Sequence, residues 1–85
     1  MYVFHTDPSH GWLAVKLSEL VRLGIDGKIS SFSYENKGTV YLEEDCDMQK
    51  FVDAKEARNE DFLSPHTKHV DYCHPIRSYK PYKGE

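Results

Sequence analysis

The sequence lacks the features that mark membrane, secreted and disulfide-rich proteins. No apolar run approaches the roughly 20 residues that a membrane-spanning helix needs, and the first residues do not have the pattern of a secretion signal. Only two cysteines occur, Cys46 and Cys73, which excludes a disulfide framework of several bridges. We therefore expect a cytoplasmic protein with reduced thiols and no membrane contact. A secreted protein with a Cys46–Cys73 bridge is the less favoured alternative.

Catalytic and phosphate-binding motifs are also missing. The five glycines are scattered at expected turns and do not form a phosphate-binding loop. His5, Asp7 and His10 are close in sequence and could orient a general base, but no serine or cysteine nucleophile accompanies them. The sequence therefore indicates a protein that has no enzymatic activity and needs no cofactor.

Aromatic and charged residues are plentiful. The 85 residues suffice for a single domain over 1–85, and one tryptophan, six tyrosines and four phenylalanines compensate for an apolar fraction of 39%. The net charge of −3 argues against a simple basic nucleic-acid binder. Residues 43–61 hold eight acids against three bases, whereas residues 62–85 are mildly basic. The chain thus has an acidic middle and a basic tail.

Turn signals and apolar spacing predict a small α+β fold. Apolar residues at helical spacing indicate two helices, at about 16–23 and 47–58, and Gly24 is suited to end the first of them. A central β-hairpin is predicted over 28–43 because two alternating segments flank a turn that contains glycine. We expect an antiparallel sheet of three to five strands with both helices on one face. Further short strands are predicted at 2–5 and 12–15, and the tail 62–85 is expected to be irregular or to supply an edge strand.

The predicted hairpin has one buried and one exposed face. Side chains alternate across a strand, so residues two apart share a face. The expected buried set is Phe32, Tyr34, Val40 and Leu42, and the expected outward set is Thr39, Tyr41 and Glu43.

The acidic segment after the hairpin is the first candidate site. Asp45 or Asp47 could cap the second helix, and the neighbouring acids suit the positive end of its dipole. A second interpretation is an acidic docking patch for a basic protein partner. The residues of this predicted partner-binding surface are Tyr41, Glu43, Glu44, Asp45 and Asp47.

The basic, tyrosine-rich tail is the second candidate. Tyrosines beside basic residues can stack with the bases of single-stranded nucleic acid. The alternative is that these tyrosines cover a sheet edge and complete the small core. The candidate nucleic-acid-binding residues are Arg77, Tyr79, Lys80 and Tyr82.

Histidines and a cysteine in the tail form the third candidate. Zinc takes thiolate and imidazole ligands, often from pairs separated by two to four residues. A zinc site would use His66, His69, Cys73 and His74, but the Cys-x-x-Cys pair of common structural sites is missing. Cys46 is expected to be a small buried residue at the start of the second helix. A metal site is therefore an alternative to the main interpretation.

Several segments together resemble a family of small uncharacterised bacteriophage and prophage proteins. They are the run His-Thr-Asp-Pro-Ser-His-Gly-Trp-Leu-Ala-Val at 5–15, the run Thr-Val-Tyr-Leu-Glu-Glu-Asp-Cys-Asp at 39–47, and Pro-Ile-Arg-Ser-Tyr at 75–79, with shorter pieces between 19 and 34. Ser9 departs from the glycine expected at that turn. The resemblance implies a phage accessory protein in the bacterial cytoplasm and assigns no catalytic residue.

These observations lead to one main hypothesis. We expect a non-enzymatic accessory protein that binds a host protein and modulates or inhibits a defence or housekeeping system. A single-stranded nucleic-acid-binding module and a small zinc-binding domain are the alternatives. A small core and an open sheet edge allow either a monomer or a homodimer.

Overall fold

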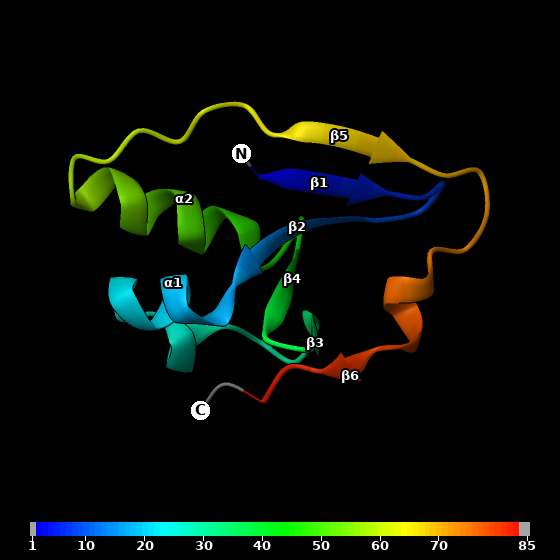
Figure 1. The fold of residues 1–85 in the computed structure, drawn as a ribbon, viewed down its shortest axis with the longest axis horizontal. Helices are drawn as coiled ribbons and strands as arrows, with labels where there is room; N and C mark the ends of the chain where they lie inside the picture. Colours follow the sequence, from blue (N-terminus) through cyan, green and yellow to red (C-terminus); the bar gives the residue numbers. More distant parts are fainter. Residues whose placement is uncertain (1, 84–85) are drawn as a thin grey trace.

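The computed structural model describes residues 2–83 and contains one six-stranded sheet with two helices against it (Figure 1). The strand order is β5-β1-β2-β4-β3-β6. The predicted α+β class is therefore confirmed. In chain order the elements are β1 (Val3–Thr6), β2 (Gly11–Lys16), α1 (Leu17–Leu23), the 3-10 helix η1 (Asp26–Lys28), β3 (Tyr34–Asn36), β4 (Thr39–Glu43), α2 (Met48–Ala57), β5 (His66–His69), the 3-10 helix η2 (Pro75–Ser78) and β6 (Lys80–Pro81).

The sheet is mixed and larger than predicted. β5 runs parallel to β1, whereas the other strand pairs are antiparallel. β5 runs parallel to β1 because α2 carries the chain from the end of β4 to the far side of β1. β5 leaves little sign in the sequence because all four of its residues are exposed and it has no alternation of apolar and polar side chains. The prediction of a purely antiparallel sheet with three to five strands is corrected accordingly.

The first helix ends as its sequence predicts. Gly24 has a φ of 74°, in the left-handed region that glycine adopts without strain. Its N–H donates to Val21 O at 3.0 Å, and the N–H of Ile25 donates to Leu20 O at 3.0 Å. These two bonds form a Schellman motif, which satisfies the last carbonyls of the helix.

The hairpin is shorter than predicted. β3 begins only at Tyr34, because residues 26–33 form η1 and a turn instead of a strand. Lys37 and Gly38 alone connect β3 to β4, and both have positive φ, at 51° and 83°. This two-residue turn twists in the sense that antiparallel strands require.

The predicted faces of the hairpin are partly wrong. Tyr34 pairs directly with Tyr41, so both rings lie on the same side of the sheet. Val40 and Leu42 point to the opposite side and are buried, as predicted. Phe32 precedes the strand and is 68% exposed. Tyr34 therefore lies on the face opposite to the predicted one, because β3 pairs it with Tyr41 and not with Val40 or Leu42.

The hydrophobic core lies between the sheet and the helices. β2 and β4 at the centre of the sheet supply alternate apolar residues, and the helices supply their inward stripes. Within residues 2–83, no helix has the length and apolar character needed to cross a bilayer. The buried core comprises Leu13, Val15, Leu20, Leu23, Ile25, Ile29, Val40, Leu42, Phe51 and Tyr82.

The other side of the sheet, which we call the open face, carries a different set of side chains. Alternation along the strands places His5, Trp12, Ala14, Tyr34 and Tyr41 there. The helices pack on the opposite side, and the segment that contains η2 covers one end of the open face (Figure 1). The open face therefore offers ring systems for contact where the helices leave it uncovered.

Candidate binding site on the open face

Asp7 fastens the tail of the chain to the turn between β1 and β2. Its carboxylate accepts hydrogen bonds from the N–H groups of Ser9 and His10, both at 2.9 Å, which shapes the turn. It also accepts from the N–H of His74 at 3.1 Å and from Arg77 Nε at 2.9 Å. Asp7 is buried, so a single charged group joins segments 70 residues apart.

The pKa of the Asp7 carboxyl lies well below its ordinary value. Burial opposes ionisation, but the hydrogen bonds from His74, Arg77 and the turn outweigh it. The pKa of Glu60 is likewise lowered, to about 2, chiefly by its hydrogen bonds from Arg22. Both acids are thus more acidic in the folded chain than in the unfolded chain.

This difference predicts acid sensitivity. A carboxyl with a lowered folded-state pKa stabilises the fold above its unfolded value, here 3.8 for Asp7 and 4.5 for Glu60, and this stability is lost as the pH falls further. We expect the urea midpoint to fall steadily from about pH 5 to about pH 2. Asp7→Asn should make this decline shallower, and Asp71→Asn, at an exposed position, should leave it unchanged. If the urea midpoint of Asp7→Asn falls with pH as steeply as that of the unchanged chain, the lowered pKa of Asp7 is not a source of the acid sensitivity.

Trp12 lies at the centre of a cluster of rings on the open face. His10 stacks on its indole with ring centroids 5.8 Å apart, and Tyr34 meets it edge-on at 6.4 Å. His74 approaches at 6.1 Å, and the Arg77 guanidinium lies 5.8 Å from the indole centroid. Trp12 is only 1% exposed as a result.

One polar atom in this cluster is unsatisfied. Trp12 Nε1 is buried and has no hydrogen-bond partner among residues 2–83. It belongs to a residue that lines a cavity of about 360 Å³, within the roughly 300–1,000 Å³ typical of ligand pockets. We call this cavity the Trp12 pocket; it is lined by His10, Trp12, Phe32, Tyr34, Glu43, Asp45, Cys46 and Arg77.

Arg77 also determines which nitrogen of the His10 ring carries the proton. Arg77 Nη2 lies within hydrogen-bond distance of His10 Nδ1. A guanidinium only donates, so Nδ1 must accept and the imidazole proton resides on Nε2. Nε2 of His10 is therefore the N–H donor of the ring, and Nδ1 is not free to act as a base.

The acidic segment 43–47 is not the exposed surface that the sequence predicts. Glu43 is 8% exposed, and its Oε1 accepts the N–H groups of Asp45 and Cys46, each at 2.8 Å. The prediction that Glu43 faces solvent is therefore wrong, because its carboxylate closes the turn after β4. Glu44 and Asp45 are exposed, and Asp45 lines the Trp12 pocket.

Asp47 is fully buried and serves the fold. Its carboxylate accepts from the N–H and hydroxyl of Ser30, from the hydroxyl of Ser33 and from Lys50 Nζ. It occupies the position before α2 but makes no side-chain cap there. The predicted roles of Asp47, in partner binding and in capping, are thus replaced by a connection between α2 and the loop before β3.

Cys46 is exposed rather than buried, which corrects its predicted place in the core. Desolvation raises the pKa of its thiol, and so do the hydrogen bond to Glu43 and the charges of Asp47 and Asp45. Thiolates are the reactive form of cysteine. Cys46 therefore lacks the activation expected of a catalytic nucleophile at neutral pH.

A second hollow, which we call the sheet groove, lies elsewhere on the open face. It has a volume of about 680 Å³. Tyr41 and His5 meet there edge to face with centroids 5.9 Å apart. Lys68 of β5 and Lys16 at the end of β2 also line it. Tyr41, predicted as part of the acidic surface, thus belongs to a groove with lysines.

The tail residues predicted to bind nucleic acid are divided by the structure. Tyr82 is buried in the core and its hydroxyl donates to Asp26 O at 2.7 Å, so it cannot stack with a base. Arg77 is held by Asp7. Tyr79 packs beside Tyr41 with centroids 5.2 Å apart, and Lys80 is exposed on β6. These four residues therefore do not form one surface.

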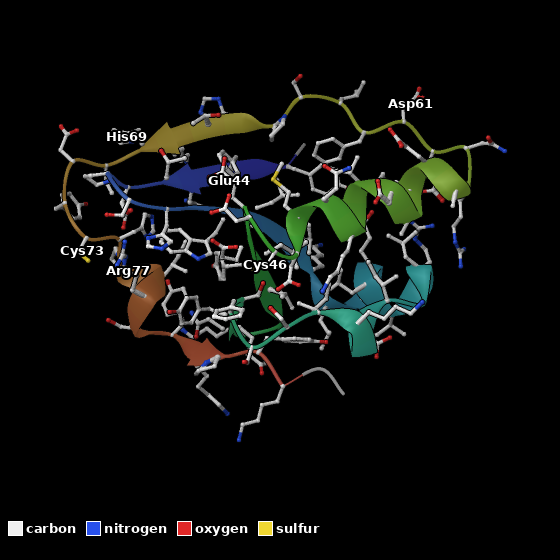
Figure 2. All side chains as sticks on the ribbon, turned by 180° about the vertical axis from the view of Figure 1, so that it is seen from behind. Glu44, Cys46, Asp61, His69, Cys73 and Arg77 are labelled. Carbon is white, nitrogen blue, oxygen red and sulfur yellow. The ribbon has the colours of Figure 1, made fainter. Side chains whose placement is uncertain are left out.

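The predicted zinc ligands are also apart. Within residues 2–83, no group of three or more His, Cys, Asp or Glu side chains is placed to hold a metal ion. His69 bonds to Thr6 and Asp71, and His74 Nδ1 accepts the N–H of Ile76. Cys73 lies at the end of the molecule that also carries His69, and Cys46 lies nearer the middle (Figure 2). Both cysteines are free.

Sequence reasoning missed the central residue of the site. Trp12 falls in the predicted strand 12–15, whose four residues are all apolar, so their composition does not distinguish a ring on the open face from one in the core. The alternation Trp12-Leu13-Ala14-Val15 was the available signal, since it places the tryptophan opposite Leu13 and Val15.

Comparison with protein-family models, curated proteins and solved structures found no match. The resemblance to bacteriophage proteins therefore stays a prediction. The geometry itself favours binding: one part of the open face has a pocket with ring walls, an unsatisfied donor and the exposed carboxylate of Asp45, and another part has a groove with two lysines.

Proposed function

We propose that this chain is a non-catalytic binding module and that a protein partner docks at the Trp12 pocket. If the resemblance to phage proteins holds, the partner is a bacterial host protein and binding modulates or inhibits it. The unsatisfied indole N–H of Trp12 is the observation that carries this proposal.

A buried donor without a partner costs roughly 1–3 kcal/mol. Trp12 Nε1 has less than 1 Å² of accessible surface, so a docked chain reaches it only when the side chains around the indole move aside. An acceptor from the partner, such as a main-chain carbonyl, would then remove the cost at Trp12 Nε1.

The chemistry around Trp12 suggests which side chains the partner presents. Both N–H groups of the turn after β4 bond to Glu43 Oε1 and neither to Oε2, and Asp45 is exposed next to Glu43. These two carboxylates suit a lysine or arginine of the partner. Phe32, 68% exposed and lining the pocket, offers an apolar contact next to them. The matching segment would combine a basic and an apolar side chain.

The proposal predicts that contact centres on Phe32 and Asp45. A photo-crosslinking residue at position 32 should capture a protein from bacterial lysate, whereas the same residue at Leu63, 76% exposed and away from the pocket, should not. Asp45→Asn should weaken binding of the captured protein about tenfold. The matched control Asp53→Asn, on the exposed side of α2, should bind normally.

The single tryptophan provides an independent readout. Addition of the purified partner should shift the one indole N–H resonance in a ¹⁵N–¹H correlation spectrum, because that N–H gains an acceptor. Equal crosslinking from positions 32 and 63, or an indole resonance that does not move, would show that the Trp12 pocket is not the contact surface.

A further inference from the structure

We infer that the sheet groove binds single-stranded nucleic acid, with bases stacked on Tyr41 and His5 and phosphates held by Lys16 and Lys68. This function goes beyond the proposed protein contact, since it uses another part of the open face and other side chains. Three observations support it: the shape of the floor, the state of the rings and the charge of the groove.

The floor of the groove is shaped by strand register. Val3, Ala14 and Tyr41 are direct neighbours across β1, β2 and β4, so their side chains form one row on the open face. The small Ala14 lies between two larger side chains and leaves room above the sheet. The Tyr41 ring stands at one side of this room, with the His5 ring 5.9 Å away. The two ring planes meet at 61°, so each ring would stack with a different base of a strand.

The rings are suited to stacking with bases. Burial, together with the nearby His74 and Lys68, lowers the pKa of His5, so the imidazole is neutral at neutral pH. Burial first, and then Tyr79, raises the pKa of Tyr41, which therefore keeps its proton. Sheet faces that present aromatic rings in this way are a common platform for single-stranded bases.

The charge of the groove favours a polyanion even though the whole chain is acidic. Lys16 and Lys68 are exposed, and within residues 2–83 neither makes an ion pair with a carboxylate. The carboxylate of Glu19 also lines the groove. It is compensated, because it accepts from Tyr2 Oη at 2.6 Å and lies 3.4 Å from Lys55 Nζ.

The competing occupant is an acidic peptide, which the lysines would also attract. Two rings beside a flat floor give a base a stacking contact that a run of carboxylates does not use. A single strand would therefore use both kinds of side chain in the groove, since its bases stack on the rings and its phosphates bind the lysines. This places the nucleic-acid contact on β1, β2, β4 and β5 instead of on the predicted tail residues, of which Tyr79 packs beside Tyr41.

The test is fluorescence anisotropy with labelled oligo-dT and oligo-rU of about ten nucleotides. We expect binding in roughly the 10⁻⁶–10⁻⁴ M range that weakens between about 50 and 200 mM salt. The double variant Lys16→Glu/Lys68→Glu should weaken binding at least tenfold. The control Lys28→Glu/Arg58→Glu changes the charge equally on η1 and at the end of α2, and should bind as the unchanged chain does.

Two further arms separate stacking from general anion binding. Tyr41→Leu keeps an apolar side chain but removes the ring, and should weaken binding about fivefold. An abasic strand of equal length and a poly-glutamate peptide should both bind much more weakly than oligo-dT. Thermal unfolding of each variant confirms that it is folded.

The inference is overturned if oligonucleotides do not bind at low salt, or if the abasic strand or poly-glutamate binds as well as oligo-dT. Equal losses in the two charge-reversal variants would also overturn it, since the groove would then have no special role.

Discussion

Replacement of Asp7 by alanine is expected to lower the free energy of unfolding by about 3 kcal/mol. The change removes the acceptor for two N–H groups of the β1–β2 turn and for the tail at His74 and Arg77. Arg77 would then lose its anchor over Trp12. For a chain of this size, roughly 4–13 kcal/mol stabilises the fold in total, so the loss is large.

Two measurements check this effect. Urea unfolding gives the change in free energy, and hydrogen exchange shows whether the amides of residues 74–82 lose protection first. The control Asp71→Ala removes a carboxylate that is 97% exposed and bonds only to His69 among the described residues, and should change stability by less than about 0.5 kcal/mol. If Asp7→Ala and Asp71→Ala unfold alike, Asp7 does not fasten the tail.

Replacement of Asp47 by alanine is expected to cost about 3 kcal/mol as well, for a different reason. The buried hydroxyl of Ser33 and the N–H of Ser30 would lose their acceptor inside the protein, where no solvent replaces it. The N–H of Glu43 donates to the same Ser33 hydroxyl, so the end of β4 should loosen too. Urea unfolding measures the loss.

The control for Asp47 lies on α2, the helix that follows it. Asp53→Ala removes an exposed carboxylate that, among residues 2–83, accepts only from Gln49 at 2.9 Å, and it should be nearly neutral. Serine at position 47 is a further comparison, since its hydroxyl can accept one of the lost bonds and should recover part of the stability. If Asp47→Ala does not change the free energy of unfolding, the Asp47 carboxylate is an ordinary exposed acid at the start of α2 and not a buried acceptor.

Asp7→Ala and Asp47→Ala should also differ in their effect on the Trp12 pocket. Asp7 holds Arg77, which lines the Trp12 pocket over the indole, whereas Asp47 acts on the pocket only through Ser33 and the end of β4. Asp47→Ala should loosen the Glu43 side of the Trp12 pocket without releasing Arg77 and His74 from Trp12. Asp7→Ala should release Arg77 and His74 from Trp12 and alter both stability and the indole resonance.

Features set by near neighbours in the chain were predictable. The end of α1 follows from Gly24 and Ile25, because a left-handed residue and the apolar residue after it complete a local motif. The turn at Lys37 and Gly38 and the existence of α2 depend likewise on residues within one or two turns of each other. Such patterns fix dihedral angles whatever the rest of the chain does.

Features that join distant segments were not predictable. Asp45 and Asp47 are two residues apart and chemically equal, yet one is exposed and the other is fully buried. The difference arises because Ser30 and Ser33 happen to face Asp47. The run of acidic residues at 43–47 therefore predicts a charged surface, but it does not predict which of the carboxylates stay exposed to solvent.

The sequence by itself determined the α+β class, both helices and the central turn, since these depend on periodicity and backbone preferences over a few residues. Only the tertiary structure decided that β5 joins β1 in parallel, that Tyr82 enters the core and that Trp12 faces a pocket. Each of these depends on contacts between segments far apart in the chain, such as Asp7 with Arg77. The backbone preferences of neighbouring residues do not indicate which distant segments will meet.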